Sequence, residues 1–199
     1  MESRVKPGLD GTQGTRNQVK EDGVGTPRTV RICDAVLRLV ALAATLIAAA
    51  VIGTARQTKT VNIQVSPTLP PLPLTVAAKT AYSSAFVYFL IANVIACVYS
   101  AISLATSTVK RDSKSNIGLS LSIIDIAMVA LLFSGNGAAL TFGLLGKHGN
   151  SHVQWQKVCN VFGKFCLDVA VSSMVSLLGS VAYVLLVLLA LVSLHKRSP

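Results

Sequence analysis

The sequence predicts an all-α membrane protein, a four-helix transmembrane bundle with a disordered cytoplasmic N-terminal tail. Only 13% of the 199 residues are charged and 52% are hydrophobic, with a mean hydropathy of +0.61, whereas soluble domains carry about 25% charged residues. The apolar residues gather in four long runs, and the segment before the first run is polar. This pattern is typical of a multi-pass membrane protein.

Four apolar runs reach about 20 residues, the length that a helix needs to cross ~30 Å of hydrocarbon. Backbone groups in lipid must be satisfied within the segment, so these runs are expected to be helices. No segment alternates with period two, which argues against a β-barrel. The expected spans cover residues 36–54, 84–105, 117–140 and 167–194. They define a four-span domain over residues 35–195, followed by a short C-terminal tail over residues 196–199.

The segments outside the spans differ in character. Residues 1–34 are expected to form the disordered tail, because they are rich in glycine, threonine and charged side chains and lack apolar periodicity. No apolar core stands near the start, so no secretory signal peptide is expected. Residues 56–83 contain four prolines and are expected to be extended and irregular. Residues 141–166 form a polar connection that holds Trp155.

Lysine and arginine counts predict the orientation of the spans. One side carries six basic residues in the N-terminal tail, three in the turn between spans two and three, and two in the C-terminal tail, against six on the other side. The excess predicts both termini in the cytoplasm. The net charge of +10 is assigned to topology and to contact with membrane lipids, and not to nucleic acid, because the basic residues lie on tails and loops between apolar runs.

Asp125 is the most informative single residue, since a carboxylate within span three costs at least ~2.5 kcal/mol unless it is paired or protonated. Arg38 in span one is its natural partner. Their depths differ by roughly 9 Å at ~1.5 Å per residue, a gap that an extended arginine side chain nearly covers. We expect a structural ion pair that fixes which helices are neighbours. A proton or ion relay, and snorkelling of Arg38 towards Asp34, remain alternatives.

A relay normally needs several ionisable groups at depth. Asn93 is the only other strongly polar side chain that the sequence places deep in a span. A small transporter or channel that uses Asp125 is therefore kept only as the alternative function. No catalytic set and no cofactor site is predicted.

Cys159 and Cys166 lie on the predicted outer side, an oxidising compartment, so we expect a disulfide. In one straight helix their Cα atoms would be ~10 Å apart, too far for a bridge, so Gly163 would have to interrupt the helix. Two free thiols remain the alternative. Metal binding with His148 and His152 is disfavoured because their spacing matches no zinc motif.

Small side chains recur at helical spacing on two spans. Such faces let helix backbones approach closely in membranes, and they serve either packing within one bundle or association with another copy. The run over residues 134–139 near the outer end of span three is a candidate for a loosened or kinked helix. The expected helix-packing residues are Ser172, Ser176, Gly179 and Ser180 in span four and Asn93, Ala96 and Ser100 in span two.

Several stretches together resemble a known family. Residues 31–38, Arg-Ile-Cys-Asp-Ala-Val-Leu-Arg, lead into span one, and residues 86–93, Phe-Val-Tyr-Phe-Leu-Ile-Ala-Asn, open span two. Span three carries Asp125 and then Leu-Phe-Ser-Gly over residues 132–135, and the outer loop combines Gly-Asn-Ser-His over residues 149–152 with Trp155 and the two cysteines. This combination resembles the CASP-like proteins of plants, relatives of the Casparian strip membrane domain proteins.

The resemblance implies a multi-pass plasma-membrane protein, related to the MARVEL group, that forms homo- and hetero-oligomers with related four-span proteins. The Arg and Asp typical of the family correspond to Arg38 and Asp125. The founding members build a membrane scaffold that recruits cell-wall-modifying enzymes, so extracellular wall-modifying proteins are expected partners. The proline-rich first outer loop lacks the aromatic-rich stretch of the Casparian strip members proper. The expected function therefore goes no further than a non-enzymatic CASP-like scaffold.

Overall fold

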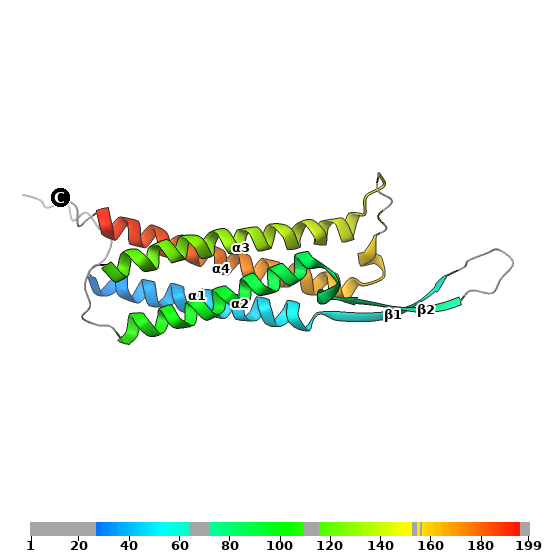
Figure 1. Ribbon diagram of the computed structural model, residues 1–199, viewed down its shortest axis with the longest axis horizontal. Coiled ribbons are helices and arrows are strands. Elements are labelled where there is room, and N and C mark those ends of the chain that lie inside the picture. Colours follow the sequence, from blue (N-terminus) through cyan, green and yellow to red (C-terminus); the bar gives the residue numbers. More distant parts are fainter. Residues whose placement is uncertain (1–26, 64–71, 110–115, 153–154, 156, 196–199) are drawn as a thin grey trace, which may run out of the picture.

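The computed structural model describes residues 27–63, 72–109, 116–152, 155 and 157–195. Four long helices form an elongated bundle (Figure 1). Each is long and apolar enough to cross a membrane, so the predicted four-helix fold class is confirmed. The helices are α1 (Pro27–Thr54), α2 (Ser84–Val109), α3 (Asn116–His148) and α4 (Gly163–His195).

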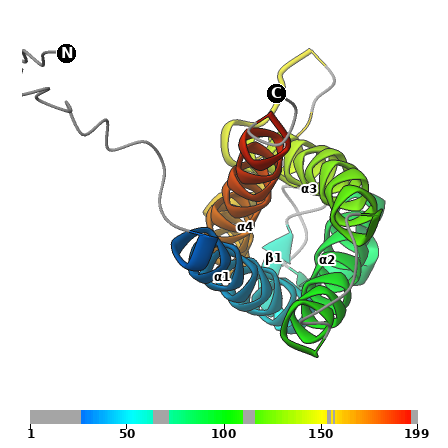
Figure 2. The same cartoon turned by 90° about the vertical axis from the view of Figure 1, so that its left-hand side faces the viewer.

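The helices stand at the corners of a square when the bundle is viewed along its length (Figure 2). Helix α1 packs against α2 and α4, and α3 packs against the same two helices. Small side chains make these contacts close. A Cβ atom added at Gly179 in α4 would lie 3.3 Å from Cγ2 of Thr45 and 3.4 Å from Cβ of Ala44 in α1. The interior is therefore filled largely by alanine, serine and a few aromatic rings.

The helices extend beyond the expected spans, by four residues at the end of α2 and at the start of α4, and by more at the start of α1 and the end of α3. Helix α1 already begins at Pro27, so residues 27–34, which we placed in the disordered tail, form its first turns. The rest of that tail, residues 1–26, lies outside the described part of the chain. Helix α3 continues without interruption to His148, beyond the expected end at residue 140. The expected loosening at residues 134–139 is absent, because Gly135 lets α3 pack on α2, where an added Cβ would lie 3.3 Å from Cβ of Ala92.

The described parts of the segment between α1 and α2 are two paired β-strands, so the chain there is extended as expected but regular, and the expectation of irregular structure was wrong for these residues. Strands β1 (Arg56–Ile63) and β2 (Leu72–Lys79) pair antiparallel, from Arg56 opposite Lys79 to Ile63 opposite Leu72. The ribbon extends well beyond the end of the bundle (Figure 1). It is rich in threonine and valine, whose branched side chains favour strands. Residues 64–71, with three of the four prolines, lie outside the described residues.

Two contacts fix the base of the ribbon to the helices. After β2, a short 3₁₀ helix (Thr80–Tyr82) leads into α2, and the Thr80 hydroxyl donates to the Ile52 carbonyl at 2.6 Å. This carbonyl lies in the last turn of α1, where it also accepts from the Ala55 amide at 3.3 Å. Gln57 in β1 accepts a hydrogen bond from the Phe165 amide at 3.0 Å, which joins the ribbon to the start of α4.

The connection between α3 and α4 lies at the same end of the bundle (Figure 1). A bridge pairs Asn150 with Trp155, and a 3₁₀ helix (Val158–Asn160) precedes α4. Gly149, with φ +70°, makes this turn possible, because an added Cβ would lie 2.7 Å from the Trp155 carbonyl oxygen.

Candidate functional site

An ion pair lies inside the bundle near the ends at which α1 begins and α4 finishes. Arg38 in α1 is 5% exposed and Asp125 in α3 is 1% exposed. The guanidinium donates through both terminal nitrogens, with Nη2 3.2 Å from Oδ2 and Nη1 3.4 Å from Oδ1. A two-point contact of this kind fixes geometry as well as charge. The structure therefore places the two sequence-predicted residues together, and the ~9 Å difference in estimated depth does not keep them apart.

Arg38 also contacts Asp34, one turn earlier on α1. Its Nε lies 3.1 Å from Oδ2 of Asp34, whose side chain is 34% exposed. The contact that we treated as an alternative to the buried pair therefore coexists with it. The guanidinium links a half-buried carboxylate to a fully buried one, so each nitrogen of its planar fork has an acceptor.

Helix α2 completes this cluster with two hydroxyl groups. Tyr99 donates to Oδ1 of Asp125 at 2.7 Å, and Ser103, which is buried, accepts from Nη1 of Arg38. Three helices thus meet at one charged centre. The sequence placed Ser103 on the small-residue face of span two, but it predicted neither residue as a partner of the ion pair, because hydroxyl side chains are common in the spans.

Tyr183 connects α4 to the same region. Its ring stacks beside that of Tyr99, with centroids 6.2 Å apart. Its hydroxyl donates to the Ala96 carbonyl at 2.8 Å and lies 2.6 Å from Oγ of Ser100. Because the Tyr183 hydroxyl donates its single proton to the Ala96 carbonyl, the Ser100 hydroxyl must be the donor in its bond with the Tyr183 oxygen. The polar contacts therefore run from α1 through α3 and α2 to α4.

Asn136 forms a second buried polar contact, farther along α3. Its Nδ2 lies 3.1 Å from Oγ of Ser176 and 3.4 Å from Oγ of Ser180, both in α4. The expectation that Asn93 alone would be strongly polar at depth, besides the ion pair, was therefore wrong. The glycines on either side of Asn136 had indicated a loosened helix. The side-chain amide of Asn136 instead joins α3 to α4.

The predicted helix-packing residues lie inside the single-chain bundle. Asn93 is fully buried and donates to the Phe89 carbonyl at 2.9 Å. The small faces of α2 and α4 are therefore occupied by contacts within one chain, the first of their two possible uses. The buried set comprises Ser172, Ser176, Gly179, Ser180, Asn93, Ala96 and Ser100.

The two cysteines of the outer connection form a disulfide. The Cα atoms of Cys159 and Cys166 are 5.7 Å apart, because the chain leaves the 3₁₀ helix and begins α4 only at Gly163. His148 and His152 belong to no group of metal-ligating side chains within the described ranges. The arrangement as a whole offers structural cross-links between helices: an ion pair, hydroxyl contacts and a covalent bond.

Comparison with known proteins supports the sequence resemblance. The sequence model of the Casparian strip membrane protein domain matches residues 27–182. The chain is 49% identical over 197 residues to a CASP-like protein 1E2 of Vitis vinifera, covering 99% of this chain and all of that one. It is 50% identical over 187 residues to a CASP-like protein 1E1 of Glycine max, covering 94% of this chain and all of the relative.

A relative from Arabidopsis thaliana, a CASP-like protein 1E1, is 45% identical over 190 residues, which cover 95% of this chain and 97% of the relative. No solved structure matches the chain. The region of this chain that matches the domain model contains Arg38, Asp125 and the two outer-loop cysteines. The chain therefore belongs to the Casparian strip membrane protein domain family, as a multi-pass CASP-like membrane protein.

Proposed function

We propose that this protein is a non-enzymatic scaffold of the plasma membrane. In this proposal, copies of the chain assemble with one another and with related four-span proteins through their transmembrane helices. The assembly organises a membrane domain, surrounded by lipids, and presents its outer segments to extracellular wall-modifying proteins. Both termini lie in the cytoplasm.

The observation that carries the proposal is the closed contact between Arg38 and Asp125. A carboxylate that transports ions or protons must be accessible to them. Asp125 is 1% exposed and accepts hydrogen bonds from Arg38 and Tyr99. Breaking a buried pair from one side is costly in soluble proteins, about 3–5 kcal/mol. Such a contact favours a fixed bundle over a moving gate, and a fixed bundle suits a unit of assembly.

An outward face of α3 is the candidate surface for assembly. Small residues recur along it at intervals of three and four, and all of them are exposed. A Cβ added at Gly137 would meet nothing within 4 Å. Exposed small residues let a second helix approach closely, and the small faces of α2 and α4 are already used within the chain. The face consists of Ala127, Ala130, Ser134, Gly137 and Thr141.

Orientation is supported by the separation of the two ends of the bundle. The disulfide connection and the β-ribbon project from one end, and the C-terminal end of α4 lies at the other (Figure 1). Disulfides persist in oxidising compartments, which favours an extracellular position for the first end. The basic excess of the termini favours the cytoplasm for the second.

The test counts copies in the membrane. A fluorescently tagged full chain is expressed in a plant plasma membrane, and single-molecule bleaching steps and recovery after photobleaching are recorded. We expect immobile multi-copy patches for the natural sequence. Gly137→Leu is expected to reduce the number of copies per patch, because the leucine side chain would hold a neighbouring helix away.

The matched control is Ala170→Leu, at an exposed position on α4 outside the α3 face. It is expected to leave the patches unchanged. Freely diffusing single copies of the natural chain would contradict the scaffold, and ion or solute flux through liposomes that depends on Asp125 would favour a transporter. Equal loss of patches in both leucine variants would show that assembly does not use the α3 face.

A further inference from the structure

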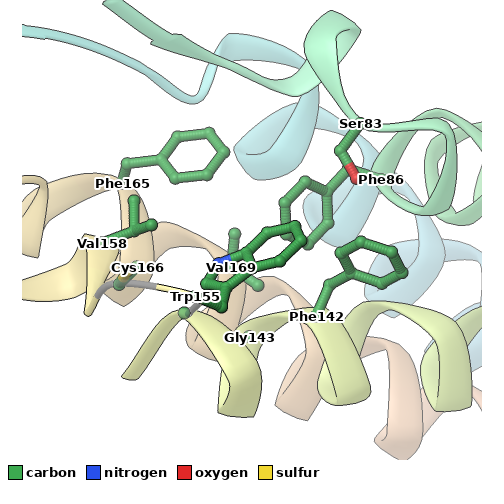
Figure 3. A pocket seen from close by; sticks show the side chains of 10 residues that line it. Ser83, Phe86, Phe142, Gly143, Trp155, Val158, Phe165, Cys166 and Val169 are labelled. Carbon is green, nitrogen blue, oxygen red and sulfur yellow. The ribbon is translucent and has the colours of Figure 1, made fainter. Parts of the chain in front are cut away.

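A cavity of about 170 Å³ lies at the end of the bundle that bears the disulfide connection. Phe86 from α2, Phe142 from α3 and Phe165 from α4 contribute three of its walls, and Trp155 covers part of it. Figure 3 shows these aromatic side chains around the same space. Phe86 already meets Phe165 and Phe142 edge to face, with centroids 5.7 and 6.3 Å apart.

One polar group faces this apolar space without a partner. Oγ of Ser83 is buried, and no polar atom among the described residues hydrogen-bonds to it. Ser83 directly precedes α2, where a serine ordinarily accepts a bond from a backbone amide of the first turn. Here the side chain makes no such contact and lines the cavity instead. A buried hydroxyl without a partner is destabilising, so a ligand that hydrogen-bonds to Ser83 would offset that cost.

Water is a poor occupant of this cavity. A buried water needs two to four polar partners, and Ser83 and the Trp155 indole are the only polar side chains in the described lining, apart from the disulfide. An engineered apolar cavity of about 150 Å³ stays dry and binds benzene. The size here therefore suits one six-membered ring, and the hydroxyl of Ser83 suits a ring that carries a hydrogen-bonding group.

The depth of the cavity favours an amphiphilic compound over a lipid tail. Helix α3 has 33 residues, about 50 Å at ~1.5 Å per residue, whereas the hydrocarbon layer measures ~30 Å. Gly143 and Gly146, which line the cavity, belong to the last two turns of α3. If the hydrocarbon layer is centred on α3, these turns reach the level of the headgroups, where aromatic rings with a polar group are enriched.

We propose that this cavity binds a small phenol-like compound, with its ring between Phe86, Phe142 and Trp155 and its hydroxyl bonded to Ser83. The ring adds edge and face contacts to an existing aromatic cluster. Ser83 either donates to the phenol oxygen or accepts its proton. The site is distinct from the α3 face proposed for assembly, because none of the five residues of that face lines the cavity.

Trp155 makes the proposal directly measurable, since it is the only tryptophan in the chain and lines the cavity. The full chain is placed in lipid nanodiscs, and its emission is titrated with 4-methylphenol or with p-xylene, which replaces the hydroxyl by a methyl group. Ligand concentrations are expressed in the lipid phase. We expect a saturable change with 4-methylphenol at about tenfold lower concentration than with p-xylene, the effect of one hydrogen bond.

Two variants and one control assign the effect to the cavity. Ser83→Ala is expected to abolish the tenfold preference and to leave p-xylene binding unchanged. Val158→Phe, at a partly exposed lining position, is expected to weaken both compounds by narrowing the cavity. Ser84→Ala, at the adjacent exposed position, is expected to change neither.

Two outcomes would overturn the proposal. The first is a linear change that does not saturate and is the same for both compounds and all variants, which means partitioning into lipid. The second is strong quenching of Trp155 by lipids brominated on their acyl chains, undiminished by 4-methylphenol, which means that a lipid tail fills the cavity.

Discussion

Replacing the two partners of the buried ion pair, singly and together, tests how the bundle is held. Asp125→Asn leaves Arg38 with its contacts to Asp34 and Ser103. Arg38→Gln leaves the Asp125 carboxylate, 1% exposed, with the Tyr99 hydroxyl as its donor among the described residues. Because the second change leaves the more deeply buried charge less compensated, we expect Arg38→Gln to be the more destabilising of the two.

The expected magnitudes follow from these contacts. Breaking a buried pair from one side costs about 3–5 kcal/mol in soluble proteins, whereas hydrogen bonds between membrane helices average ~0.6 kcal/mol. We therefore expect a loss of ~1–2 kcal/mol for Asp125→Asn and ~2–4 kcal/mol for Arg38→Gln. The double variant is expected to lose less than Arg38→Gln alone, because neither charge then remains buried without its partner.

The assay is equilibrium unfolding in mixed micelles by titration with sodium dodecyl sulfate, followed by Trp155 emission. Arg31→Gln, at an exposed position on the same helix, serves as control and is expected to stay within about 0.5 kcal/mol of the natural chain. If the losses of the two single variants add up to that of the double variant within about 0.5 kcal/mol, the side chains act independently and the reasoning is refuted.

Three further changes test other contacts in the same unfolding assay. Replacing both Cys159 and Cys166 by serine is expected to lower the free energy of unfolding by ~2–3 kcal/mol, since the disulfide closes a short loop. A reductant should lower the free energy of unfolding of the natural chain by a similar amount and leave that of the variant unchanged. Gly179→Val is expected to cost ~1–3 kcal/mol, because its side chain would press on α1, while Gly137→Val should cost less than half as much. Tyr183→Phe is expected to cost ~1 kcal/mol by removing the donor to the Ala96 carbonyl, and an unchanged midpoint would contradict that bond.

The sequence predicted the four spans because each is a long apolar run, a signal that depends on composition alone. The partner of Asp125 could also be inferred, since Arg38 is the only lysine or arginine within the expected spans. The contributions of Tyr99 and Ser103 could not. A hydroxyl side chain adds little free energy to a membrane helix, so its presence does not call for a particular partner. Which group it contacts depends on how each helix is rotated about its axis, and local sequence patterns do not contain that information.

The errors share a physical cause, a local signal that packing overrides. Glycines at 135 and 137 indicate a weak helix by propensity, yet Gly135 lies against α2, where an added Cβ would be only 3.3 Å from Cβ of Ala92. The prolines of the first connection indicated irregular chain. Only Pro73 falls within a described strand, and β1 contains Thr58, Thr60, Val61 and Ile63, whose branched side chains favour strands. Reading the two halves of this connection separately would have revealed the hairpin.

The β-ribbon also sets the distance between the charged lipid surface and a molecule bound at the far end of the described strands. Its strands have eight residues each, so the pair formed by Ile63 and Leu72 stands seven residue steps from the base pair, about 23 Å at ~3.3 Å per residue. Electrostatic potentials decay over about 8 Å at physiological ionic strength. A molecule held at the far end of the described strands is therefore screened from the headgroups, and its affinity should be the same above neutral and anionic bilayers.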